Sequence, residues 1–63
     1  MKTPMELRTE VIDIRRRHAL GQASYDEMVK KAEEYIAALK EWAKRTGNKK
    51  FKIPSVAYVL RAL

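Results

Sequence analysis

The feature that most constrains this chain is a stretch between Ser24 and Gly47 that contains neither glycine nor proline. Ser24 and Glu27 form a capping-box pattern, in which each side chain can satisfy a free backbone amide at the start of a helix. Gly47 followed by Asn48 supplies an end signal, because glycine adopts the left-handed conformation that closes a helix at little cost. The sequence therefore predicts one long helix over residues 25–46.

A second helix is predicted nearer the N-terminus, over residues 4–19. Thr3 supplies a hydroxyl at the N-cap, Pro4 occupies the first helical position, and the Glu6 carboxylate stands three residues after the cap. Gly21 closes this helix in the same way as the glycine after the long one. Steps of four, three and four residues place one set of side chains on a single face of the helix. That set consists of Leu7, Val11, Ile14 and His18.

A short third helix is predicted over residues 55–63, after Pro54, with either Ile53 or Ser55 as its N-cap. Its apolar residues again share one face. They are Val56, Val59, Leu60 and Leu63. The chain has 63 residues and no cysteine, so its stability must come from helix packing or from self-association. We therefore expect a single all-α domain of three helices, in which a long antiparallel hairpin carries a docked C-terminal helix.

The apolar face of the long helix is wider than the seam that two packed helices require. An additional row is formed by Met28, Tyr35 and Trp42, and it must meet something other than the first helix. The first interpretation is that the third helix and Phe51 cover this row, because apolar stripes at helical spacing usually belong to a core. The second is that the row is an exposed strip that dimerises or receives a partner protein, since Tyr and Trp are favoured at such sites.

The charge of the chain is unevenly distributed along its length. Residues 1–41 contain eight basic and eight acidic residues, whereas residues 42–63 contain no acid and carry the whole net charge of +6. Such a positive end attracts phosphate groups and holds them through counterion release. The basic residues concerned are Lys44, Arg45, Lys49, Lys50, Lys52 and Arg61.

An alternative explanation of these charges requires no ligand. Lys44 and Arg45 fall in the last turn of the long helix, where the helix dipole favours cations whatever the function. The lysines of the following loop can keep it hydrated, while Phe51 between them points inward. The two explanations make different demands on the tertiary structure, because only the first requires the cations to lie together and without carboxylate partners.

We predict a non-enzymatic protein that binds nucleic acid or another polyanion, mainly through phosphate contacts and with little sequence preference. The alternative is an adaptor or homodimerisation module that uses the aromatic face of the long helix. Catalysis is not expected, because His18 has no nucleophile beside it. We expect His18 instead to be a partly buried residue at the edge of the core whose polar edge reaches the turn. Glu10 and Asp13 form an ordinary surface pair without a third ligand, so no metal, cofactor or small-molecule substrate is expected.

A membrane partner is also not expected. The longest apolar run, SVAYVL, is far shorter than the roughly 20 residues that span a bilayer. The N-terminal segment carries acidic residues where a secretory signal would need an apolar region. These features predict a cytoplasmic location.

Overall fold

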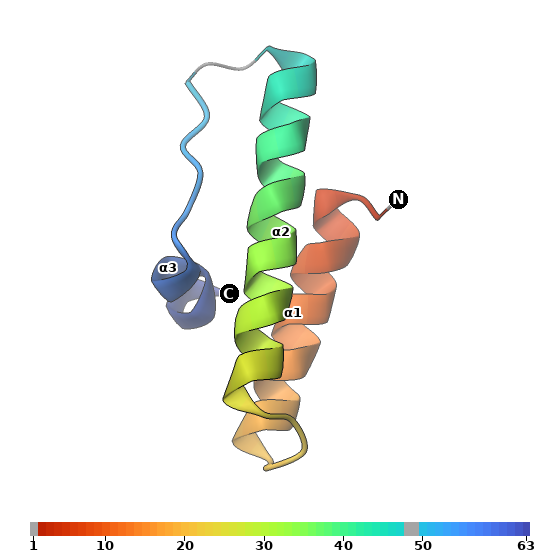
Figure 1. Ribbon diagram of the computed structural model, residues 1–63, viewed down its shortest axis with the longest axis vertical. Coiled ribbons are helices and arrows are strands. Elements are labelled where there is room, and N and C mark those ends of the chain that lie inside the picture. Colours follow the sequence, from red (N-terminus) through yellow and green to blue (C-terminus); the bar gives the residue numbers. More distant parts are fainter. Residues whose placement is uncertain (1, 48–49) are drawn as a thin grey trace.

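The computed structural model describes residues 2–47 and 50–63, and it contains three helices in that part of the chain. They are α1 (Pro4–Ala19), α2 (Tyr25–Thr46) and α3 (Val56–Ala62). Figure 1 shows α1 and α2 as an antiparallel hairpin, with the chain returning alongside α2 to reach α3. The molecule measures 39 × 22 × 15 Å. The predicted all-α architecture of a long hairpin with a short docked helix is confirmed.

The first two helices begin at their predicted capping residues. The Thr3 hydroxyl accepts a hydrogen bond from the Glu6 amide at 3.2 Å, which caps α1. At the start of α2, the Ser24 hydroxyl accepts from the Glu27 amide at 3.2 Å, and the Ser24 amide donates to the Glu27 carboxylate at 3.3 Å. This reciprocal capping box satisfies two amides that would otherwise lack partners. Both helices have the predicted bounds.

The other helix ends follow from local backbone chemistry. Gly21 and Gly47 have φ values of 76° and 69°, so each closes its helix in the left-handed conformation. At α3, the Ser55 hydroxyl accepts from the Tyr58 amide at 3.2 Å, which makes Ser55 the N-cap rather than Ile53. The third helix is one residue shorter at each end than the predicted range of 55–63.

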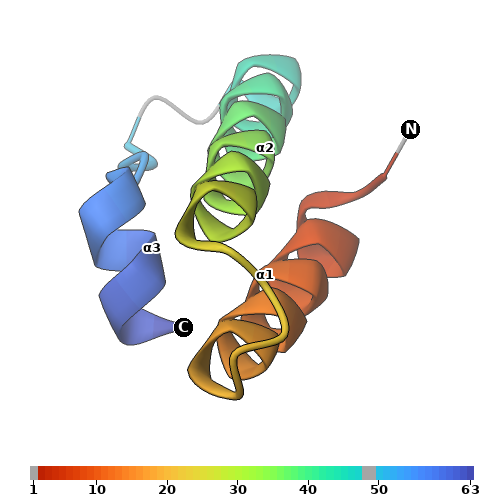
Figure 2. The same ribbon diagram turned by 60° about the horizontal axis from the view of Figure 1, so that its bottom comes forward.

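The core is centred on α2. Each helix contributes one fully buried residue to it, namely Val11, Ala32 and Val59, with exposed fractions of 0%, 0% and 1%. Ala32 is small, so the two neighbouring helices can both approach α2 closely at this level. Figure 2 shows α1 and α3 flanking α2, and Figure 1 shows α3 nearly end-on beside the vertical α2, so α3 crosses α2 rather than running along it. The half-buried residues packed around this cluster are Tyr35, Ile36, Val56, Leu60 and Leu63.

His18 fixes the end of α1 to the connection that follows it. Its ring is half-buried, and Nδ1 donates a hydrogen bond to the carbonyl oxygen of Ala23 at 3.0 Å. The ring also meets the edge of Tyr25 at a centroid distance of 6.1 Å. The prediction that this histidine is a boundary residue reaching the turn is confirmed.

Candidate nucleic-acid interface

The C-terminal end of α2 extends beyond the start of α1 (Figure 1). This follows from their lengths, because α2 has 22 residues and α1 has 16. From Lys50 the chain runs back along α2 (Figure 1), and the ring of Phe51 packs against Trp42 at a centroid distance of 5.3 Å. This aromatic contact holds the returning segment beside the last turns of α2. The lysines on either side of Phe51 are therefore held near this end of the molecule.

Four described basic residues lie on the two segments at this end, and we call them the basic end. Lys44 and Arg45 lie in the last turn of α2, and Lys50 and Lys52 flank Phe51 in the returning segment. All four are exposed. Lys49, the fifth basic residue predicted for this surface, lies outside the described residues. The structure thus places four of the six basic residues singled out in the sequence on segments at this end of the molecule.

Arg61 is separated from the basic end. It belongs to α3, which packs against α2 well below the end of that helix (Figure 1). The extended segment between Phe51 and Ser55 carries the chain back over this distance. Arg61 is exposed on α3, but it does not form a continuous surface with Lys44 and Arg45.

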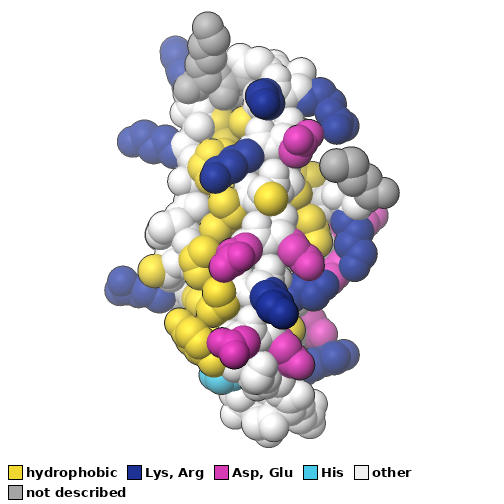
Figure 3. All heavy atoms as spheres, viewed as in Figure 1, with side chains coloured by type: hydrophobic (Ala, Val, Ile, Leu, Met, Phe, Trp, Pro, Cys, Tyr) yellow, Lys and Arg dark blue, Asp and Glu magenta, His cyan; other side chains and the backbone are white. Residues whose placement is uncertain are grey.

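The ion pairs of the described residues lie in the other part of the molecule. They join Lys2 and Lys31 to Glu10, Lys31 to Glu34, and Arg17 to Asp13. Within the described ranges, Lys44, Arg45 and Lys52 have no carboxylate within ion-pair distance. Figure 3 shows basic side chains around the upper end of one face, whereas most acidic side chains on that face gather lower down. Lys44, Arg45 and Lys52 are therefore not held in ion pairs by the described acids of the hairpin.

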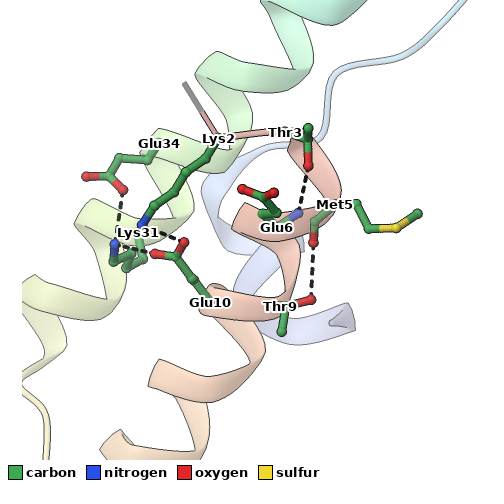
Figure 4. A network of polar contacts seen from close by, with 8 residues as sticks. All are labelled: Lys2, Thr3, Met5, Glu6, Thr9, Glu10, Lys31 and Glu34. Carbon is green, nitrogen blue, oxygen red and sulfur yellow. Dashed lines mark hydrogen bonds and ion pairs between the residues drawn. The ribbon is translucent and has the colours of Figure 1, made fainter.

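The carboxylates considered for chemistry in the sequence are both engaged in salt bridges. Figure 4 shows Glu10 receiving two ammonium groups, and its oxygens lie 2.7 Å from the Nζ atoms of Lys2 and Lys31. Hydrogen bonds from Lys2 and then Lys31 hold the pKa of Glu10 below its ordinary value. Asp13 is 3.1 Å from Arg17 one helical turn later. Among the residues that the structure describes, no group of three His, Cys, Asp or Glu side chains is arranged to hold a metal ion.

An open apolar groove of about 540 Å³ lies next to the basic end, between the start of α1 and the last turns of α2. Its walls include Pro4, Met5, Leu39, Trp42 and Phe51. Three charged residues also line it, namely Lys2, Glu41 and Arg45. Met5 is 79% exposed and Trp42 is 41% exposed, so the groove offers apolar surface to solvent.

The sequence does not single out the groove residues of α1. Pro4 is explained by the helix start, and Met5 stands outside the apolar stripe of that helix. The one sequence feature that could have indicated a groove here is the difference in length between the two predicted helices. A hairpin of unequal helices leaves the end of the longer one uncovered, and the start of the shorter one then borders that surface.

The additional apolar row of α2 is divided between core and surface. Met28 is only 8% exposed, and Tyr35 is half-buried against the cluster that contains the α3 residues. Of these three residues only Trp42 is exposed, and Phe51 covers part of its ring. The row therefore does not form one continuous exposed strip, and a partner using it would meet mainly Trp42.

No model of a known protein family matches the chain, and no similar protein was found among curated proteins or solved structures. In the described part of the chain, none of the helices is both long and apolar enough to cross a membrane.

Proposed function

We propose that this protein binds nucleic acid without catalysing a reaction, and that the basic end makes the main contacts. The observation that carries the proposal is the position of Lys44, Arg45 and Lys52 at one exposed end, without carboxylate partners among the described residues. Each cation that approaches a phosphate releases condensed counterions, and this release favours binding whatever the base sequence. The same surface suits other polyanions, which the experiment below includes as competitors.

The contact between Trp42 and Phe51 supports the proposal because it reduces the freedom of the returning segment. Cations on a freely moving loop lose conformational entropy when they bind, whereas cations on an anchored segment lose less. Lysine side chains on such a segment are long and act as point charges toward phosphate oxygens. Contacts of this kind fix position on the nucleic acid and carry little sequence information. We therefore propose weak sequence preference.

Arg61 and Lys49 have supporting places in this proposal. Arg61 on α3 contributes only when a strand is long enough to pass from the end of α2 to α3. Lys49 precedes Lys50 in the chain and is assigned to the interface from the sequence alone. Neither residue is required for the test that follows.

The test compares two quadruple variants that have the same net charge. The first replaces the basic end (Lys44, Arg45, Lys50 and Lys52) by Gln. The control replaces four exposed basic residues of the hairpin (Arg8, Arg16, Lys30 and Lys40) by Gln. Binding to a labelled oligonucleotide is measured by fluorescence anisotropy over a series of salt concentrations, with inorganic polyphosphate and heparin as competitors.

The proposal expects the basic-end variant to lose most of its affinity and to show a smaller salt slope. On duplex DNA the slope falls by about 0.9 for each phosphate that is no longer neutralised, so removal of the four cations reduces it by about 3–4. The control variant retains a larger share of both affinity and slope. Equal losses of affinity in the two variants mean that only the net charge of the protein matters. A wild-type salt slope near zero excludes phosphate contacts as the main source of binding free energy.

A second candidate function is protein-protein interaction or homodimerisation through the groove. The observation that favours it is the 41% exposure of Trp42 beside other apolar groove residues, because tryptophan often anchors protein interfaces. This candidate expects a mass that rises with protein concentration in light scattering, and a loss of that rise in Trp42→Ser. A constant monomer mass across the concentration range would exclude the homodimer.

A further inference from the structure

The groove and the basic end share residues and border each other. Trp42 and Phe51 line the groove, and Phe51 stands between Lys50 and Lys52. Arg45 belongs both to the groove lining and to the basic end. A chain of phosphates held by the basic end therefore passes beside an apolar hollow with aromatic walls.

We infer that the groove receives an unpaired nucleobase, and that the protein consequently prefers single-stranded to double-stranded nucleic acid. The inference rests on the proposed phosphate binding and adds the form of nucleic acid that is recognised. The planes of the Trp42 and Phe51 rings meet at 69°, so the two rings form an aromatic corner rather than a flat stack. A planar base can stack on the face of one ring while its edge approaches the other.

Charge and shape favour this occupant over a second copy of the chain. Lys2 on the groove is paired with Glu10, and Arg45 balances Glu41 there, so the charge excess beside the groove comes from the neighbouring Lys44, Lys50 and Lys52. Two copies that met through this surface would bring like charges together, which costs binding energy. A single strand supplies negative phosphates for the cations and an apolar base face for the rings. In a duplex the bases are paired and stacked, so they cannot enter the groove.

Trp42 is the one tryptophan of the chain, so its fluorescence reports on the groove directly. The protein is titrated with a single-stranded DNA of about 12 nucleotides, a length within the usual range for one binding domain. Three further ligands are a strand of the same length without bases, a duplex of the same length, and inorganic polyphosphate. Poly-glutamate serves as an acidic polypeptide that lacks both bases and phosphates.

The inference expects strong quenching of Trp42 by the base-containing single strand and little by the other four ligands. It also expects the base-containing strand to bind about tenfold more tightly than the abasic strand, which corresponds to about 1.4 kcal/mol. Phosphate binding without base insertion predicts that the single strand and the abasic strand bind equally and leave Trp42 unquenched. That result overturns the inference and leaves the proposed function intact.

Variants separate the groove from the phosphate contacts. Trp42→Leu is expected to abolish the preference for the base-containing strand over the abasic strand while retaining the salt slope. Tyr58→Leu is the matched control, because Tyr58 is 62% exposed and does not line the groove. Met5→Ser tests the opposite wall with little risk to folding, since Met5 is 79% exposed, and it is expected to weaken quenching of the intact Trp42.

The remaining outcomes also decide between the alternatives. Equal quenching by poly-glutamate and by the single strand overturns the inference in favour of a polypeptide ligand. If Tyr58→Leu loses the preference for the base-containing strand over the abasic strand, base binding cannot be assigned to the groove. Absence of binding to every anionic ligand, including the abasic strand and the duplex, refutes the proposed function itself and the inference with it.

Discussion

Lys31 Nζ on α2 lies 2.7 Å from Glu10 Oε1 on α1, and this ion pair joins two helices through residues that are 21 positions apart in sequence. Lys2 reaches the other oxygen of Glu10 at 2.7 Å, and Glu34 accepts from Lys31 at 3.3 Å. Hydrogen bonds from Lys2 and then Lys31 lower the pKa of Glu10, and the hydrogen bond to Glu10 raises the pKa of Lys31. The network makes the stability of the hairpin dependent on pH.

The first prediction concerns the loss of this stability in acid. Because the pKa of Glu10 is lower in the folded chain than its ordinary value of 4.5, its contribution is complete above 4.5 and is lost as the pH falls through the lower folded value. Glu10→Gln is therefore expected to have a lower urea midpoint than the wild type at pH 7. The difference should shrink toward zero as the pH falls below the folded pKa of Glu10.

The control for this prediction is Glu33→Gln, which removes an exposed carboxylate of α2 that has no ion pair among the described residues. It removes the same charge without breaking a bridge between helices. If the urea midpoints of Glu10→Gln and Glu33→Gln change with pH in the same way, the network does not stabilise the hairpin. On the alkaline side, the contribution of Lys31 to stability is complete below pH 10.5 and is lost as the pH rises through the raised pKa of the folded chain.

The second prediction tests the docking of α3. Val59 is 1% exposed and lies in the cluster with Val11 and Ala32. Val59→Ala removes two buried methyl groups and leaves a cavity, so it should lower the free energy of unfolding by about 2 kcal/mol. Tyr58→Ala is the neighbouring control, because Tyr58 is 62% exposed and its truncation should change stability by at most about 0.5 kcal/mol. Urea unfolding followed by circular dichroism measures both, and equal effects would contradict the docked position of α3.

The third prediction concerns the turn that ends α2. Gly47 has φ of 69°, a conformation that costs a residue with a side chain about 1–2 kcal/mol. Gly47→Ala should lose about that much stability, and Gly47→Asn should lose less because asparagine tolerates this conformation better. A Cβ at Gly47 would meet no heavy atom of the described residues within 4 Å, so backbone strain rather than a clash is responsible. If thermal melts gave Gly47→Ala a higher melting temperature than Gly47→Asn, the turn would have another conformation in solution.

The fourth prediction concerns the aromatic contact that anchors the basic end. Phe51→Ala removes the ring that covers part of Trp42, so the tryptophan emission should shift to longer wavelength as water reaches the indole. The aromatic pair itself is worth about 0.5–1.5 kcal/mol, which should appear as a small loss of stability. Oligonucleotide affinity should also fall, although Lys50 and Lys52 are still present. An unchanged emission maximum would mean that Phe51 does not rest on Trp42 in solution.

Local chemistry was sufficient to locate the helices from the sequence. The N-caps Thr3 and Ser24 and the left-handed glycines at 21 and 47 act within a few residues, so α1 and α2 have the bounds that these signals predicted. The apolar faces of α1 and α3 were also readable, because the spacing of side chains around a helix is fixed. The choice between Ile53 and Ser55 at α3 needed the structure, since both positions were compatible with the local pattern.

The sequence by itself determined three helices, an apolar stripe on each, and an uncompensated positive charge after residue 41. Only the tertiary structure decided which of those charges lie together, because the extended segment after Phe51 returns α3 toward the middle of α2 and takes Arg61 with it. It likewise buried Met28, left Trp42 at the surface, and created a groove with Met5. These outcomes depend on how far one helix extends beyond another and on where the chain turns back, and neither is encoded within a single helical turn.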